Sequence, residues 1–329
     1  MIRHLICLAL AAITLTGCAT DKAVISQANQ QQDQLEPAII QDRQVQAFMD
    51  KIGGRIVAAA KELDEQGVGP KSHKKGDNDW MFKDVQFHMV NSKTLNAFTT
   101  GGHHVYIYSE LFTMAKSEDE FAAVCAHEFA HIYCRHVQQG MDRQYAILGG
   151  AAVAAVGGAA IAGRDNLATG AAAGGGLGLA AGQFLGMGFT RDDENEADKY
   201  GFQFYTHAGW DPNHFADFFK AMIAAGYDKT PEALSDHPKL ANRVTNTERR
   251  VSELPPTAKQ WRRPDSFTPS EFRTVQARVA QAAKHPPKGQ AGQAAELMLQ
   301  AFPSCVAPAE TKEQKSAQQR ILDALNRQK

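Results

Sequence analysis

The sequence has almost no net charge, since 35 lysines and arginines balance 36 aspartates and glutamates to a formal charge of −1. A protein that binds nucleic acid needs a basic surface, so we expect no nucleic-acid partner. The chain also lacks an uninterrupted apolar run of membrane-spanning length, and its N-terminal run, Leu5–Leu15, is too short to cross a bilayer. With 329 residues, 43% of them hydrophobic, we expect one sizeable domain and an appendage.

Cysteine is scarce, with five in the whole chain. Cys7 and Cys18 belong to the N-terminal segment described below, which leaves Cys125, Cys134 and Cys305. Cys125 and Cys134 are nine residues apart on an expected helix, about 13 Å along its axis, which is too far for a disulfide. Either of them could pair with Cys305 in an oxidising compartment, and the sequence does not choose between them.

Residues 146–189 form a stretch rich in glycine and alanine. As a helix, residues 146–162 would reach about 25 Å, short of the bilayer core of about 30 Å. Residues 167–189 are long enough, but eight of these 23 residues are glycine, which disfavours a helix. We expect a close-packed helical hairpin against the membrane surface or a partner, with a flexible loop or a true membrane hairpin as alternatives. The preference rests on a glycine stripe that lets two helices approach closely, namely Gly170, Gly174, Gly178, Gly182 and Gly186.

The chain is organised around the stretch Cys125-Ala126-His127-Glu128-Phe129-Ala130-His131. Because His127 and His131 are four apart, they share one helix face and can both offer a ring nitrogen to one zinc ion. Glu128 would then lie beside the metal, where it could take a proton from water. The alternative is an ordinary helix with two surface histidines.

A hydrolytic zinc site needs three protein ligands and an open position. His136 is expected on the opposite side of the helix from His127, and the metzincin spacing is absent. Glu194 and Asp198 lie four apart on a second expected helix. Glu194 could bind zinc while Asp198 accepts the other N–H of a ligand histidine. The alternative is an acidic helix start that suits the helix dipole.

These two motifs, together with a later His237-Pro238, resemble the HtpX and CAAX-prenyl-protease family of zinc metallopeptidases. The resemblance is closest to its soluble lipoprotein branch in Gram-negative envelopes, the BepA- and LoiP-like proteins. It covers roughly residues 36–255. It implies a gluzincin endopeptidase fold of the α+β class, mostly helical with a small sheet, and one zinc per chain.

The resemblance also implies roles for three further elements. His237 corresponds to the family's His-Pro element, and either it or Arg243 is the candidate donor to the reaction's oxyanion. His237 could also occupy the open metal position at rest, or merely cap a helix. Asn96, Ala97 and Phe98 resemble an edge strand beside the metal that would pair with an extended substrate peptide.

The N-terminus reads as a lipoprotein signal peptide over residues 1–17, because Leu15-Thr16-Gly17-Cys18 resembles a lipobox. Cys18 would then carry the lipid that tethers the protein to the membrane. An ordinary cleaved signal peptide is the alternative. By resemblance, Ala19 after the cysteine suggests delivery to the outer membrane, hence a periplasmic location.

The remaining chain divides into a flexible glutamine-rich tether over residues 18–35, a metallopeptidase domain over 36–260 and a helical extension over 261–329. We expect a long helix from Glu36 to Glu65, and a capping box at Ser117 and Gly140 as a stop signal for the histidine helix. Strands are expected at 85–90, 96–98 and 105–108. Further helices are expected at 238–253, 269–284, 288–301 and 312–327.

The sequence thus predicts a zinc endopeptidase of the cell envelope with protein substrates that are misfolded or unassembled. A chaperone or assembly factor for outer-membrane proteins is the main alternative, working with an assembly machinery or as a homo-oligomer through the glycine-rich hairpin. A purely structural zinc protein is the third, but a structural site is usually closed by four ligands and has no use for Glu128.

Overall fold

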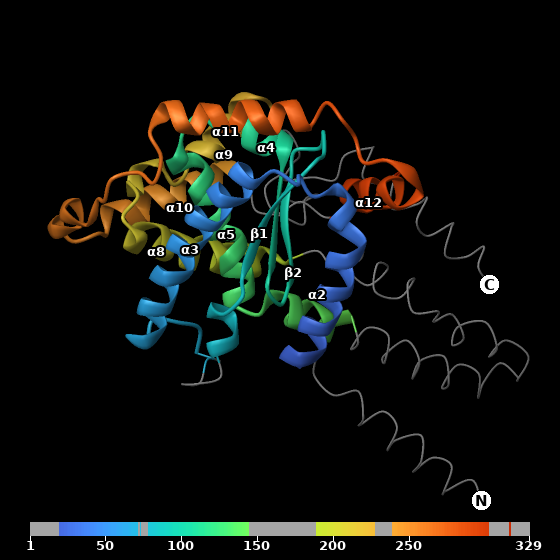
Figure 1. Ribbon diagram of the computed structural model, residues 1–329. Coiled ribbons are helices and arrows are strands. Elements are labelled where there is room, and N and C mark those ends of the chain that lie inside the picture. Colours follow the sequence, from blue (N-terminus) through green and yellow to red (C-terminus); the bar gives the residue numbers. More distant parts are fainter. Residues whose placement is uncertain are drawn as a thin grey trace, which may run out of the picture.

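Figure 1 shows the computed structural model of the protein, mostly helical with one small sheet, as expected. It describes residues 20–71, 73, 78–144, 189–227, 239–302 and 316. The helices whose two ends are both described are α2 (Asp21–Leu35), α3 (Arg43–Glu65), α4 (Ser109–Met114), α5 (Glu118–Tyr133), α8 (Arg191–Ala208), α9 (Asp217–Ala224), α10 (Leu240–Ser252), α11 (Pro269–Ala282) and α12 (Gly289–Ala301). The strands are β1 (Gln86–Val90), β2 (Ala97–Gly101) and β3 (His104–Tyr108).

The sheet has the order β1-β3-β2, with β1 parallel and β2 antiparallel to β3. The turn between β2 and β3 is made by Gly101 and Gly102, whose φ angles are +75° and +58°. Glycine suits this turn because a side chain strains a residue at positive φ. All three expected strands are therefore confirmed, and β2 lies at one end of the sheet order.

The sheet is the middle of three layers (Figure 1). On one face its side chains pack into the main core with α3, α5 and α8, and on the other with α2 and α12. The split follows the alternation of side chains along a strand. The main core takes Phe87, Met89, Ala97, Val105 and Ile107, and the second core takes Val90, Phe98, Tyr106 and Tyr108.

The tether expected over residues 18–35 is wrong from Asp21 onward, because α2 is a regular helix docked on the sheet. Thr20 caps it by accepting a hydrogen bond from the Ala23 N–H. Its composition is polar, but one face is buried at helical spacing. That face consists of Val24, Ala28, Gln31 and Leu35.

The single helix expected from Glu36 to Glu65 is also wrong at its start. A short 3₁₀ turn ends at Ala38, and Ile39 then bridges to Val90 beside the sheet. The helix α3 begins only at Arg43, where the Asp42 carboxylate accepts from the N–H groups of the first turn. The first residues of this segment therefore extend the sheet instead of the helix.

The extension expected over residues 261–329 contributes to the main core of the protein. The ring of Phe48 on α3 packs against Phe267 and Phe272, with centroids 4.7 and 5.8 Å away. The buried Glu118 carboxylate at the start of α5 accepts from the backbone N–H groups of Ser266 and Phe267, both at 2.8 Å. The helices α11 and α12 confirm the predicted ones within two residues, and residues 312–327 are not described apart from Ser316.

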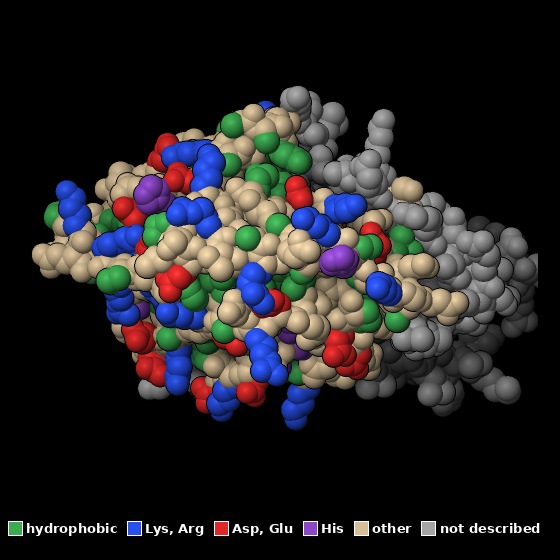
Figure 2. Space-filling view, turned by 45° about the horizontal axis from the view of Figure 1, so that its top comes forward, with side chains coloured by type: hydrophobic (Ala, Val, Ile, Leu, Met, Phe, Trp, Pro, Cys, Tyr) green, Lys and Arg blue, Asp and Glu red, His purple; other side chains and the backbone are tan. Residues whose placement is uncertain are grey.

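The predictions for the glycine-rich hairpin lie almost entirely outside the described residues, since 145–188 are not among them. Within the described part, no helix has both the length and the apolar character needed to cross a bilayer. Cys125 and Cys134 are buried free thiols, and Cys305 is not described. On the described part of the face drawn in Figure 2, lysine and arginine are interspersed with aspartate and glutamate.

A buried histidine pair joins the sheet to α2. His88 Nε2 lies 3.1 Å from His104 Nδ1, and His104 Nε2 lies 3.1 Å from the Asn29 side-chain oxygen. Burial, with the neighbouring His104 second, lowers the pKa of His88 from 6.5 to about 3. Burial, with His103 second, lowers the pKa of His104 to about 4. Both rings are therefore neutral in the folded protein down to acidic pH.

We expect the free energy of unfolding to fall as the pH drops below 6.5. The unfolded chain then binds protons that the folded pair excludes, so stability is complete above the ordinary histidine pKa and is lost towards the lowered one. The lowered pKa of His88 alone should reduce the free energy of unfolding by about 2 kcal/mol at about pH 5. Urea unfolding at several pH values checks this. His88→Gln should flatten the dependence, whereas His285→Gln on the surface should not. An unchanged slope in His88→Gln would contradict it.

Candidate metal centre

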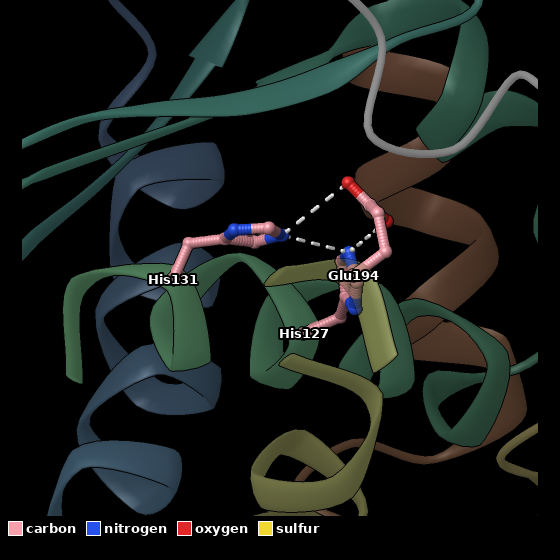
Figure 3. A group of neighbouring side chains, drawn as sticks. All are labelled: His127, His131 and Glu194. Carbon is pink, nitrogen blue, oxygen red and sulfur yellow. Dashed lines mark hydrogen bonds and ion pairs between the residues drawn. The ribbon is translucent and has the colours of Figure 1, made fainter. Parts of the chain in front are cut away.

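Two helices that pack side by side, α5 and α8, bring the three expected ligands together (Figure 3). His127 Nε2 lies 3.2 Å from His131 Nε2 and 3.4 Å from Glu194 Oε2. His131 Nε2 lies 3.8 Å from Glu194 Oε1. Gly201 permits this approach, because a Cβ on it would lie only 3.0 Å from the His127 backbone.

The donor set fits a zinc ion. Bonds of about 2.0–2.2 Å at a tetrahedral centre separate the donor atoms by about 3.3–3.6 Å. The three separations observed here, 3.2 to 3.8 Å, bracket that range. Two histidines and a glutamate are also the donors of a catalytic zinc site, which leaves a fourth position open. All three side chains are at most 1% exposed, so the group lies inside the protein.

Asp198, one turn after Glu194 on α8, contacts the first histidine as expected. Its Oδ1 lies 3.0 Å from His127 Nδ1, the ring nitrogen that faces away from the group. When Asp198 accepts a hydrogen bond from the Nδ1–H, the lone pair of His127 is on Nε2 and points toward the metal position. The aspartate is in turn held by two hydrogen bonds from Arg243, at 2.9 and 2.7 Å.

Arg243 is buried at the centre of this arrangement. Besides Asp198 it reaches Glu194 Oε2 at 3.5 Å, and its guanidinium stacks on the Phe219 ring at 4.0 Å. The expected donor to an oxyanion is thus a residue that holds two acidic side chains of the site. The structure places it on α10, which confirms the helix predicted after Pro238.

The two ligand histidines differ in their protonation. Burial and Arg243 lower the pKa of His127, but Asp198 and Glu194 outweigh them and raise it to about 9. Burial holds the pKa of His131 well below its usual 6.5, although Glu194 opposes this. Burial raises the pKa of Asp198, but Arg243 and His127 together outweigh it, so the pKa of Asp198 is lowered. A metal entering this site must therefore displace a proton from His127, which disfavours binding at acidic pH.

The expected position of His136 is wrong, because the histidine helix does not run on to Gly140. Ser117 caps α5 by accepting a hydrogen bond from the Glu120 N–H, although the Glu120 carboxylate accepts from the Lys116 N–H and does not complete the predicted capping box. The helix ends at Tyr133, and Arg135 takes a left-handed φ of +57°. This break turns His136 back toward the site. Its Nδ1 lies 2.9 Å from His131 Nδ1, on the side away from the metal position.

Glu128 is fully buried beside His127 on α5, as the motif requires. Asn96, Ala97 and Phe98 are buried at the start of β2. Phe98 stacks on Phe302 with centroids 4.2 Å apart, and Asn96 Nδ2 donates to the Phe302 carbonyl at 3.4 Å. The residues Cys18 and His237 are not described, so their roles stay predictions.

Sequence reasoning missed two contacts of His131. The Phe189 ring stacks on it at 4.0 Å, and His136 bonds both to it and to Glu196, the latter at 3.1 Å. Glu196 lies only two residues after the expected ligand Glu194, and this closeness in sequence could have marked Glu196 as a candidate site residue.

Comparison with known proteins gives the same region. The pattern of Peptidase family M48 matches residues 78–251. A putative beta-barrel assembly-enhancing protease of Vibrio cholerae is 31% identical over 221 residues, 66% of this chain and 41% of that protein. The beta-barrel assembly-enhancing protease of Escherichia coli K12 is 32% identical over 177 residues, 53% of this chain and 36% of that protein. Mitochondrial metalloendopeptidase OMA1 of Schizosaccharomyces pombe is 30% identical over 170 residues, 51% of this chain and 47% of that protein.

The chain therefore spans less than half the length of these relatives. The matched region contains both helices of the metal group, β1 to β3 and Arg243. It covers more than half of the chain, and it carries the ligand set that the geometry selects. This protein belongs to peptidase family M48.

Proposed function

We propose that this protein is a zinc-dependent endopeptidase of the cell envelope, with His127, His131 and Glu194 as the zinc ligands. The observation that carries the proposal is the buried group of two histidines and one glutamate, at zinc-ligand spacing, with Glu128 next to it. When bound, zinc would polarise the peptide carbonyl and make water a nucleophile near neutral pH.

The residues of the chain divide the remaining work. Glu128 takes the proton of the attacking water and passes it to the leaving amine. Asp198 accepts a hydrogen bond from the Nδ1–H of His127, so that this ring keeps one tautomer and one orientation. Arg243 holds Asp198 in turn. Since two of its N–H groups are occupied in this way, His237 is our preferred donor to the oxyanion, and it could also block the open position at rest.

Substrate peptides would bind in extended form along β2, at Asn96, Ala97 and Phe98. This strand lies at the end of the sheet order, which favours strand addition, but Phe302 packs against Phe98 and would have to move. Substrates would be misfolded or unassembled envelope proteins. We further propose a periplasmic location, with a lipid on Cys18 as the anchor to the outer membrane.

A second candidate function is assistance to outer-membrane protein assembly, with proteolysis secondary. The bacterial relatives are named beta-barrel assembly-enhancing proteases, which favours it. A partner in that process would be an assembly machinery, or a second copy bound through the glycine-rich hairpin. Complementation of an assembly defect by a hydrolysis-deficient variant would favour this function over proteolysis.

Metal removal tests the proposal. The purified protein should contain one zinc per chain and cleave an unfolded protein such as casein. Dialysis against a chelator should remove both the metal and the activity, and added zinc should restore both. The double variant His127→Ala, His131→Ala should bind no zinc, whereas His285→Ala on the surface should bind it normally. Zinc retained by the double variant, as measured by elemental analysis, would refute the ligand assignment.

A further inference from the structure

The imidazole of His136 contacts the metal ligand His131 on the side that faces away from the metal position. His136 Nδ1 lies 2.9 Å from His131 Nδ1, and His136 Nε2 lies 3.1 Å from Glu196 Oε2. The His136 side chain is fully buried, while Glu196 is partly exposed. Glu196 also lines a solvent-open cavity of about 900 Å³. A chain of three side chains therefore leads from the candidate metal centre to the surface.

The break after α5 creates this chain. Arg135 adopts a left-handed conformation there, and its side chain is held by Asp21 on α2 at 3.0 Å and by Asn78 at 3.0 Å. An uninterrupted helix would point His136 away from His131. On α8, Glu196 lies two residues from Glu194, so it faces a different side of that helix and reaches His136 instead of the metal position.

Only one arrangement of protons suits these distances with neutral rings. His131 Nε2 faces His127 and Glu194, so as a ligand it keeps its lone pair there and carries its proton on Nδ1. That proton is donated to His136 Nδ1, which must be the acceptor. The proton of His136 is then on Nε2 and is donated to the Glu196 carboxylate.

We propose that His136 and Glu196 are positioning residues for the metal ligand His131. They fix its tautomer and its orientation, as Asp198 does for His127. The helix α8 thus supplies the metal ligand Glu194 and two further carboxylates. Asp198 holds His127 directly, and Glu196 holds His131 through His136. The proposal rests on the zinc site proposed above.

A second metal ion is the competing explanation for this group. Donor atoms of Cys134, His136 and Glu196 all lie within 4.8 Å of one another. A metal on His136 Nε2, however, would leave the His136 proton on Nδ1, facing the Nδ1 proton of His131. Both metals could then be bound only if one of the two rings also lost its single N–H proton and became an imidazolate. The hydrogen-bonded chain from His131 through His136 to Glu196, here called the relay, is therefore the arrangement that is compatible with a metal on His131.

The test measures zinc affinity by competition with a chromogenic chelator. Loss of a hydrogen-bond partner of a ligand weakens zinc binding by about 10- to 100-fold, and we expect this for His136→Ala and Glu196→Leu. Glu196→Gln keeps an acceptor oxygen for His136, so it should lose less than about 10-fold. Asp192→Asn removes an exposed charge from the same helix turn and should change nothing. Thermal unfolding without metal shows which variants keep the fold.

Cobalt substitution gives a second readout. In Glu196→Leu the visible d–d bands of the bound cobalt should shift, because the His131 ring is reoriented, and in Glu196→Gln they should stay near those of the unmodified protein. Equal losses of zinc affinity in the leucine and glutamine variants would indicate a simple charge effect and overturn the relay. Wild-type affinity in Glu196→Leu would overturn it as well.

The same spectra distinguish the second-ion explanation. A near-ultraviolet thiolate-to-cobalt band that is lost in Cys134→Ser, but kept in the control Cys125→Ser, would show a bound ion at Cys134 and overturn the proposal. A protein that binds no zinc at all, even when unmodified, would instead refute the proposed metal centre. These two failures are therefore separable.

Discussion

Replacing Glu128 with glutamine is expected to lower the rate of peptide hydrolysis by a factor of about 10² to 10⁴, the usual contribution of a general base. Glutamine has the shape of glutamate but cannot take up a proton at neutral pH. Because His127, His131 and Glu194 are untouched, zinc content and affinity should stay as they are. Steady-state cleavage of a fluorogenic peptide, together with elemental analysis, measures both quantities.

The matched control is Glu110→Gln, which neutralises an exposed glutamate on α4, outside the site. It should leave both hydrolysis and metal content unchanged. The effect of Glu128→Gln should fall on kcat and not on KM, since the carboxylate acts on the water and not on the peptide. Full activity in Glu128→Gln would contradict the mechanism, and loss of zinc in this variant would assign the residue to metal binding.

The metal ligands could be predicted because helix geometry is local. His127 and His131, and likewise Glu194 and Asp198, are four residues apart, which places each pair on one helix face whatever the surrounding fold. That the two pairs meet depends on close packing of α5 and α8, for which Gly201 is the permissive residue. This contact is not local. The prediction assumes it because a hydrolytic zinc site needs a third ligand, and the family resemblance agrees with that assumption.

The position of His136 could not be predicted for the opposite reason. It depends on the break at Arg135, whose side chain bonds to Asp21, 114 residues earlier in the chain. The sequence near Arg135 does not predict this helix break, because Cys134 and Arg135 are both tolerated within helices. The helix α2 was hidden similarly. Its glutamine-rich composition resembles a linker, while the burial of Val24, Ala28 and Leu35 depends on the sheet and α12.

The sequence and the structure assign different roles to Arg243. From the sequence it is a candidate donor to the oxyanion. In the structure it is 2% exposed and lies between two acidic residues, Asp198 and Glu194. A buried charge of this kind must be paired. Its removal would leave His127 as the one partner of the buried Asp198 carboxylate among the residues that the structure describes.

We therefore expect Arg243→Met to lower the free energy of unfolding by about 3–5 kcal/mol, the usual cost of removing one partner of a buried ion pair. Methionine keeps the apolar contact with Phe219, so the loss is electrostatic. Zinc affinity should fall as well, because Asp198 is no longer held against His127. The control is Arg249→Met on the same helix, whose exposed pair with Glu253 is worth less than about 1 kcal/mol. Urea unfolding with and without zinc measures both effects. If Arg243→Met instead kept its stability and its zinc but lost kcat, the guanidinium would be the oxyanion donor, and its positioning role would have to be abandoned.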